Sequence, residues 1–77
     1  MYHTYFMFQR RYRIPETGVY YSYDIVVYGP LYRGPIQIVR DVSTDGDLVF
    51  RMITTFNENH LLPEHLMDAI QDFLSTE

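Results

Sequence analysis

The spacing of hydrophobic residues changes once along this chain, near residue 41, and this change restricts the fold more than any other feature. Up to that point apolar and polar side chains tend to alternate, which is the period of a β-strand. Beyond it apolar side chains recur every three or four residues, which is the period of an amphipathic helix. We therefore expect one domain over residues 1–77, with a sheet in residues 1–41 and two helices in residues 42–77.

Charge divides at the same place. Five of the six basic residues precede position 41, all of them arginines, and eight of the ten acidic residues lie at or after it. The formal net charge is -4, which argues against a protein that coats DNA, because such binding requires cations that neutralise phosphates. A local basic patch on the sheet half is still compatible with this balance.

Length and composition set the class of the protein. With 77 residues, 47% hydrophobic and 17% aromatic, the chain has enough apolar side chains to fold but is too short for a large core. Self-association is therefore an expected source of stability. The sequence contains no cysteine, which excludes disulfides and thiolate metal sites. Its apolar runs are far shorter than the ~20 residues of a membrane span, so we expect a soluble, cytoplasmic protein.

A β-hairpin is the first predicted element. Two alternating stretches, residues 2–14 and 19–28, flank a Pro-Glu-Thr-Gly sequence that is typical of a turn. If Ile14 faces Val19 across this turn, even residues of the first strand lie opposite odd residues of the second.

This register sorts the side chains of the hairpin onto two faces. One face carries apolar pairs such as Phe8 with Ile25, and we expect the helices to cover it. The other face is left open to solvent. It pairs Tyr5 with Tyr28, Met7 with Val26, Arg11 with Ser22 and Arg13 with Tyr20.

A third strand and two helices are predicted for the rest of the chain. Residues 36–41 form a short strand after a loop rich in proline and glycine, whose tip presents Tyr32 and Arg33. Thr44 is the expected N-cap of the first helix, and Pro63 suits the first position of the second. The apolar stripes of the two helices are Val49, Met52, Ile53 and Phe56, and then Leu66, Ala69, Ile70 and Phe73.

Together these elements predict an α+β fold in two layers. A three-stranded antiparallel sheet, made of the β-hairpin plus the third strand, is followed by a helical hairpin that packs on one of its faces. The outer surface of the helices is then acidic and faces water. Its residues are Glu58, Glu64, Asp68 and Asp72.

No group of residues in the sequence predicts catalysis. Residues 41–47 place oxygen ligands at alternate positions before a glycine, as a calcium-binding EF-hand loop does, but Met52 stands where the closing glutamate is required. His60 and His65 lie on either side of a helix break and do not form a metal-ligand pattern. We therefore expect a non-enzymatic protein without catalytic residues, a metal, a cofactor or a small-molecule substrate.

The open face of the sheet is the strongest candidate for a function. An aromatic and methionine patch on a face that no helix covers is typical of a docking surface or of a homodimer interface. We expect a protein partner, or a second copy of the chain, to bind there. The predicted contact residues are Tyr5, Met7, Arg11, Arg13, Tyr20, Val26, Tyr28, Tyr32 and Arg33.

Two other functions are compatible with the sequence. Arginines beside tyrosines also bind single-stranded nucleic acid, although the lack of lysines and the negative net charge favour a protein partner. Alternatively, the acidic helix face imitates a nucleic-acid backbone, as in an anti-CRISPR-like inhibitor encoded by a phage or a mobile element.

Residues 41–74 run from a turn of acidic residues and serine through one helix, an Asn-rich break, a Leu-x-Pro step and a helix that ends in Asp-Phe-Leu. The positions that carry this pattern are Asp41, Ser43, Asp45, Phe56, Asn57, Leu61, Pro63, His65, Leu66, Ile70, Asp72 and Phe73. In these features the chain resembles a family of short uncharacterised proteins from clostridia and related Firmicutes. The resemblance implies a bacterial origin and a strand-rich first half before the helices, and it supplies no catalytic residue.

Overall fold

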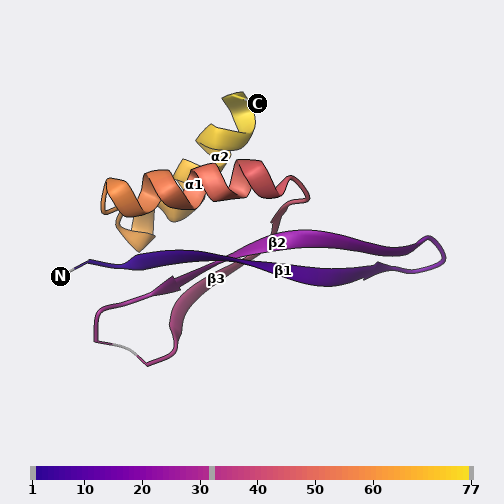
Figure 1. Cartoon of the computed structure of the whole chain (residues 1–77), viewed down its shortest axis with the longest axis horizontal. Coiled ribbons are helices and arrows are strands. Elements are labelled where there is room, and N and C mark those ends of the chain that lie inside the picture. Colours follow the sequence, from indigo (N-terminus) through magenta and orange to yellow (C-terminus); the bar gives the residue numbers. More distant parts are fainter. Residues whose placement is uncertain (1, 32, 77) are drawn as a thin grey trace.

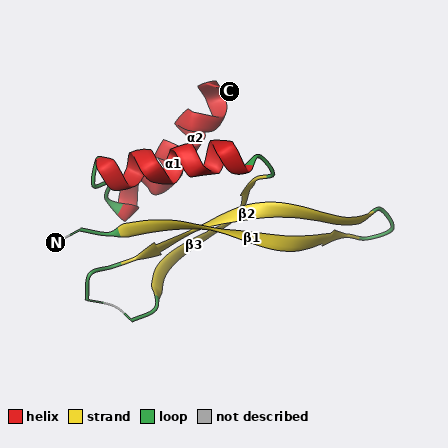
Figure 2. Ribbon diagram, in the orientation of Figure 1, coloured by secondary structure: helices red, strands yellow, loops and turns green. Residues whose placement is uncertain are grey.

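The computed structural model describes residues 2–31 and 33–76, which form a sheet with helices on one side (Figure 1 and Figure 2). Three strands come first: β1 (Thr4–Ile14), β2 (Gly18–Tyr28) and β3 (Pro35–Ser43). They are followed by α1 (Gly46–Glu58), the 3-10 helix η1 (Pro63–His65) and α2 (Leu66–Thr76). The strands lie in the order β1-β2-β3 and are antiparallel. The predicted α+β fold is therefore confirmed.

The hairpin pairs in a register that differs by one residue from the predicted one. Ile14 lies opposite Gly18 and not opposite Val19, so even residues of β1 face even residues of β2. Because successive side chains of a strand point to opposite faces, this shift changes the partners on both faces. Phe8, for example, is paired with Asp24.

The turn between β1 and β2 explains the shift. The Thr17 N–H donates to the carbonyl of Ile14 at 3.2 Å, and Glu16 has a positive φ of 67°. Proline at the second position of a turn followed by a residue with positive φ is the arrangement of a type II turn. Gly18, at φ 126°, then begins β2 with a backbone conformation that favours glycine. This tight turn closes the hairpin one residue earlier than we expected.

The hairpin extends beyond the helices, whereas β3 is shorter and irregular. Residues 10–22, which we call the hairpin arm, reach well past the helical layer (Figure 1). In β3 regular pairing stops after Val39, and residues 40–42 lie opposite Asp24 alone. Asp41 in this bulge has a φ of 54°. A bulge of this kind bends the strand and disrupts its outer edge.

The hydrophobic core lies between the sheet and the helices. The sheet contributes Tyr5, Ile25 and Val27, and none of these side chains is more than 1% exposed. The ring of Phe56 in α1 meets the rings of Tyr5 and Phe73 edge to face, at centroid distances of 5.6 and 5.7 Å. The buried helix residues are Leu48, Val49, Met52 and Phe56 of α1, and Leu66 and Ile70 of α2, while Ile53, Ala69 and Phe73 pack against them. The predicted apolar stripes of both helices are confirmed.

The first helix starts differently from the prediction. Asp45, and not Thr44, is the N-cap: its carboxylate accepts a hydrogen bond from the Leu48 N–H at 3.2 Å. A carboxylate at this position also opposes the positive end of the helix. Pro63 opens η1, which leads directly into α2. In the described part of the chain, neither helix has the length and apolar character needed to cross a membrane.

Candidate protein-interaction surface

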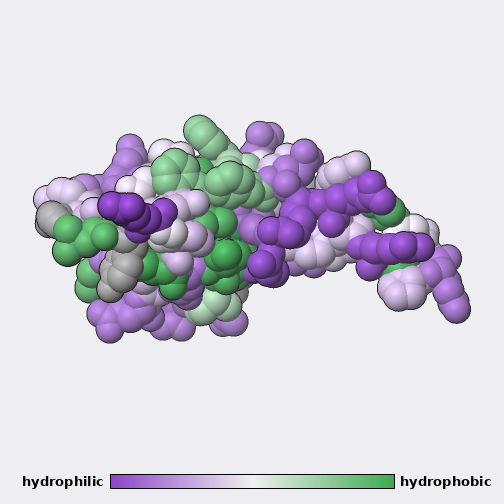
Figure 3. Space-filling view, turned by 90° about the horizontal axis from the view of Figure 1, so that it is seen from below, coloured by the Kyte–Doolittle hydropathy of each residue, from purple (hydrophilic) through white to green (hydrophobic). Residues whose placement is uncertain are grey.

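The face of the sheet opposite the helices is uncovered, and Figure 3 views the molecule from that side. Hydrophobic surface gathers there beneath the helical part of the molecule, whereas the hairpin arm is mostly hydrophilic. Phe6 and Phe8 of β1 are 44% and 50% exposed, and together with Tyr28 they line a shallow hollow. The rings of Phe6 and Tyr28 meet edge to face at 5.6 Å. Val26 and Ile38 are paired beside them in the sheet.

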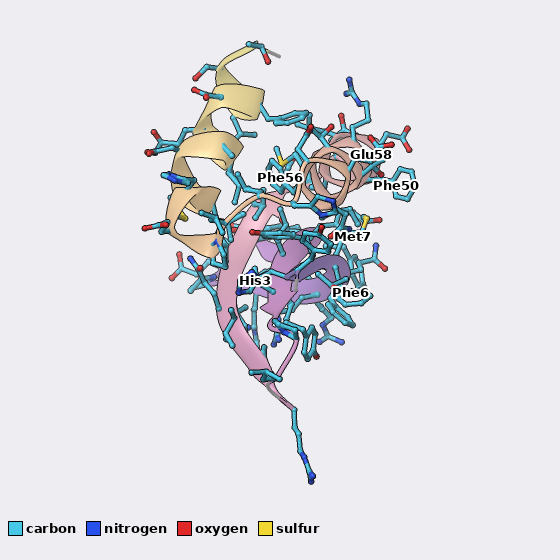
Figure 4. The ribbon with its side chains drawn as sticks, turned by 90° about the vertical axis from the view of Figure 1, so that its left-hand side faces the viewer. His3, Phe6, Met7, Phe50, Phe56 and Glu58 are labelled. Atoms are coloured by element: carbon cyan, nitrogen blue, oxygen red, sulfur yellow. The ribbon has the colours of Figure 1, made fainter. Side chains whose placement is uncertain are left out.

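Two of the predicted contact residues lie on the other face. Tyr5 is buried in the core, and its hydroxyl donates to the carbonyl of Leu61 at 2.5 Å. Met7 packs against the same core, and Figure 4 shows it on the opposite side of β1 from Phe6. The expectation that Tyr5 and Met7 lie on the uncovered face is wrong, because the observed register turns odd residues of β1 towards the helices. Phe8, which the predicted register places under the helices, is exposed instead, and so is Phe6.

Val26 and Tyr28 do lie on the uncovered face, as predicted. Val26 pairs with Phe6 on one side and with Ile38 on the other, and it is only 8% exposed between these neighbours. Tyr28 is half-buried. The accessible apolar surface is therefore carried mainly by the two phenylalanines and by Ile38 of β3, with Val26 beneath them as a support.

A buried carboxylate lies next to this apolar surface. Asp24 of β2 is 1% exposed, shielded by side chains from both neighbouring strands. The Tyr12 hydroxyl and the Asp41 N–H, the latter at 2.9 Å, donate to its Oδ1 atom. Arg10 Nε donates to Oδ2 at 2.8 Å, and Arg40 lies 3.6 Å from the same oxygen. Asp24 thus joins β1 to the bulge of β3, and its charge is matched by two arginines.

These donors determine the pKa of Asp24. Burial raises the pKa, but hydrogen bonds from the Tyr12 hydroxyl, the Asp41 N–H and the Arg10 guanidinium outweigh it, and the net pKa is lowered from the ordinary value. The carboxylate is therefore ionised at neutral pH. A group in this state fixes the sheet and is not suited to donate a proton in a reaction.

Asp41 forms a second, exposed carboxylate site on the same face. The nearby Ser22 hydroxyl and the hydrogen bond from Tyr20 lower the pKa of Asp41, and the Tyr20 hydroxyl lies 2.5 Å from its Oδ2. Among the described side chains, the buried Ser22 hydroxyl has no hydrogen bond of regular geometry, and it acts on Asp41 as a nearby dipole. The Tyr20 ring stacks on Tyr12 at 5.5 Å. Tyr20 is thus held in place by structural contacts.

The arginines and tyrosines of the predicted contact set do not share one face. Arg11 and Arg13 lie on the side of the hairpin arm that faces the helical layer, where Arg11 is paired with Tyr21, and both arginines are exposed. Tyr20 and Tyr28 lie on the opposite side of the sheet.

Arg33 belongs to the loop between β2 and β3, at the end of the sheet away from the hairpin tip (Figure 1). Arg33 is exposed, and Tyr32 lies outside the described residues. The structure therefore assembles only part of the predicted set into one surface.

All four predicted acidic residues are exposed on the helical layer. Glu58 ends α1, Glu64 lies in η1, and Asp68 and Asp72 are one turn apart on α2. Such exposure is the usual state of charged helix residues. A nucleic-acid-mimicking role for this surface stays a prediction.

The histidines take up structural or surface positions. The imidazole of His60 stacks on the ring of Tyr2, with 3.7 Å between centroids. Within residues 2–31 and 33–76 no three His, Asp or Glu side chains lie close enough together to hold a metal ion. The expectation of a non-enzymatic chain is not tested by this finding and stays a prediction.

Asn57, for which the sequence predicts no contact, closes part of the outer edge of β1. The Tyr5 N–H donates to Asn57 Oδ1 at 2.8 Å, and Asn57 Nδ2 donates to the Tyr5 carbonyl at 2.9 Å. These are the two bonds that a neighbouring strand would make. The partner of Asn57 is backbone 52 residues away, so no residue pattern signals the contact.

Comparisons with protein-family models, curated proteins and solved structures found no match. The resemblance of residues 41–74 to clostridial proteins therefore stays a prediction.

Proposed function

We propose that this chain is a non-enzymatic protein-interaction module whose uncovered sheet face binds another protein. The observation that carries the proposal is the exposure of Phe6 and Phe8, 44% and 50%, beside Tyr28 on the face away from the helices. Full burial of a phenylalanine is worth about 1.5–3 kcal/mol, so each half-exposed ring retains about 1 kcal/mol that a partner can recover. Aromatic side chains at the centre of a patch are the usual anchors of protein interfaces.

The chemistry of the partner follows from the charges around the patch. Arg10 and Arg40 are directed to Asp24, and Asp41 lies beside them in the bulge, so the two positive and two negative charges on this face balance. An apolar protein surface without a strong charge of either sign suits such a face. The hydrogen bonds of Asp24 also hold the strands in place before binding, which reduces the entropy lost on association.

The geometry gives less support to single-stranded nucleic acid as the ligand. That function needs tyrosine rings and arginines on one surface, so that bases stack while phosphates are neutralised. Arg11 and Arg13 lie on one side of the sheet, and Tyr20 and Tyr28 lie on the other. The arginines that do share the tyrosine face, Arg10 and Arg40, are paired with Asp24. The Tyr20 ring is already stacked on Tyr12.

The proposal is tested by capture of partners from extracts of the cells that carry this sequence, with Phe8→Lys beside the wild type. We expect the wild-type chain to retain at least one protein in stoichiometric amount and Phe8→Lys to lose it. Direct binding of that protein, once purified, should weaken at least tenfold with Phe8→Lys, because a buried lysine replaces an aromatic anchor.

Met67→Lys is the matched control. Met67 is 49% exposed on α2, away from the sheet face, so the same substitution there adds the same charge without touching the patch. The proposal is contradicted if every captured protein binds Phe8→Lys as well as it binds Met67→Lys. It is also contradicted if the wild-type chain captures no protein. Circular dichroism of each variant checks that its fold is unchanged.

A further inference from the structure

We propose that β1 pairs edge to edge with β1 of a second copy of this chain, which joins two sheets into one across a twofold axis. The contact uses the edge of the sheet and leaves the uncovered face free. It is therefore independent of the proposed docking of a partner protein on Phe6 and Phe8.

The two edges of the sheet differ in how well they are protected. The β3 edge begins with Pro35, which has no N–H, and its pairing is interrupted by the bulge around Asp41. In contrast, β1 pairs without interruption from Thr4 to Ile14 and contains neither proline nor glycine. A long, regular edge strand of this kind is a template for a further strand.

Asn57 shows which backbone groups of β1 are available. Its two bonds to Tyr5 place the N–H and C=O of Tyr5 on the outer edge, and this direction alternates along a strand. The backbone groups of Met7, Gln9, Arg11 and Arg13 therefore point outwards as well. In the described part of the chain, the bonds from Asn57 are the hydrogen bonds that reach this edge.

Charge selects the register of the pairing. A twofold axis at Arg10 or Arg11 would place two arginines directly opposite each other, which is destabilising. An axis at Gln9 pairs Gln9 with its own copy and Met7 with Arg11 of the second copy, so no like charges oppose each other. Each chain then forms hydrogen bonds through Met7, Gln9 and Arg11, up to the point where Asn57 occupies the edge.

The same register brings opposite charges together on the helical side. Pairing between the strands stops at Met7 of the second copy, so Arg13 of the first copy comes to lie next to the C-terminal end of α1, which Asn57 anchors at Tyr5. Glu58 ends α1, and Figure 4 shows it on the side of the helix that faces away from α2, the side on which Phe50 also lies. The cationic arm of each copy thus meets an acidic helix end.

A single introduced cysteine tests the proposed axis, because the natural sequence has none. We expect Gln9→Cys to form a covalent dimer under mild oxidation, since antiparallel neighbours lie about 5.5 Å apart between Cα atoms, within the range of a disulfide. Gln71→Cys, at an exposed position of α2, is the matched control and should stay monomeric. Equal crosslinking of the two variants would overturn the proposal.

A proline scan provides the second test. We expect light scattering to give twice the 9.3 kDa chain mass for the wild type at high concentration and the single-chain mass for Gln9→Pro. The Gln9 N–H points outwards, so its loss leaves the pairing with β2 intact, whereas Arg10→Pro should unfold the hairpin. A wild type that is monomeric at all concentrations overturns edge pairing but leaves the sheet face available to another protein. A dimer that persists in Gln9→Pro and disappears in Phe8→Lys overturns it in favour of face-to-face association.

Discussion

Asp24 lies in the central strand with almost no access to water, and it is nevertheless ionised. Its negative charge is stabilised by a hydroxyl, a backbone N–H and two guanidinium groups that come from β1 and β3. Because these donors are themselves partly desolvated, removal of the carboxylate leaves several polar groups without a partner. Asp24 is therefore the residue whose loss should cost the sheet most.

We expect Asp24→Ala to lower the free energy of unfolding by about 2–3 kcal/mol, which is the usual cost of leaving buried donors unpaired. Urea unfolding followed by circular dichroism measures this change. Asp47→Ala, on the exposed first turn of α1, is the control and should change stability by less than about 0.5 kcal/mol. If both variants lose the same free energy of unfolding, the hydrogen bonds to Asp24 do not stabilise the sheet beyond what an exposed carboxylate contributes.

The contribution of Asp24 to stability should also depend on pH. The pKa of Asp24 is lowered in the folded chain, so its contribution is fully present above the unfolded value of about 3.9 and is lost as the pH falls through the folded value. We expect the wild type to lose more stability than Asp24→Asn when the pH is lowered from 7 to 3. The urea midpoint at each pH is the measurement, and parallel pH profiles of the two proteins would refute the assignment. Asp41, whose pKa is also lowered, accounts for part of the slope that stays in Asp24→Asn.

The Asp24 network was not predictable from the sequence because it depends on the register. The predicted pairing placed Asp24 opposite Gln9, away from Arg10 and Tyr12, which it contacts in the structure. Its contact with the Asp41 N–H depends in addition on the bulge in β3, which no residue pattern announces.

At the level of elements, a single asparagine forms the hydrogen bonds that join α1 to β1. Asn57 bonds both backbone groups of Tyr5, and this contact ties the end of the helix to the start of the strand. Tyr5 and Phe56 pack beside it in the core. The joint combines two hydrogen bonds with hydrophobic contact.

We expect Asn57→Ala to lower the free energy of unfolding by about 1–2 kcal/mol, because two partly buried backbone groups lose their partner. Asn59→Ala is the matched control, since Asn59 is exposed and bonds only the Thr55 carbonyl of its own helix. Thermal unfolding of the two variants gives the comparison. If Asn59→Ala is as destabilising as Asn57→Ala, the hydrogen bonds between Asn57 and Tyr5 do not stabilise the contact of α1 with β1.

The elements themselves were predictable, and the hairpin register was not. The helical stripes have one clear apolar side, so the sequence identifies which residues are buried. In β2, however, Ile25, Val26 and Val27 follow one another and are all buried, so alternation does not distinguish the two faces. The predicted register then depended on the turn, where Glu16, with its backbone in the left-handed conformation, closes the hairpin one residue early. Glycine is the residue usually found with that conformation in a type II turn.

Over the whole molecule, the two signs of charge occupy different parts. The hairpin arm carries three arginines, and the helices carry five of the ten acidic residues and one arginine. Because the arm extends past the helical layer, it can reach a neighbouring molecule without disturbing its own core (Figure 1).

If two copies pair through β1, Arg13 of one and Glu58 of the other attract each other. We expect Arg13→Glu to raise the dimer dissociation constant roughly five- to tenfold, in line with about 1 kcal/mol for an exposed charge pair. The double variant Arg13→Glu with Glu58→Arg should recover most of this loss, as measured by sedimentation equilibrium at low salt. Equal dissociation constants for the single and double variants would place the two residues apart in the dimer.

Asn57 also limits how far a second chain can pair along β1. Its amide occupies the position that the next strand would take beside Tyr5, so an added strand can extend along β1 only as far as Met7 unless the end of α1 is released. Pairing of a further strand beside Tyr5 therefore competes with docking of the end of α1 through Asn57. The helix acts as a stop that fixes how much edge a neighbour can use, and this protects a long regular strand from open-ended polymerisation.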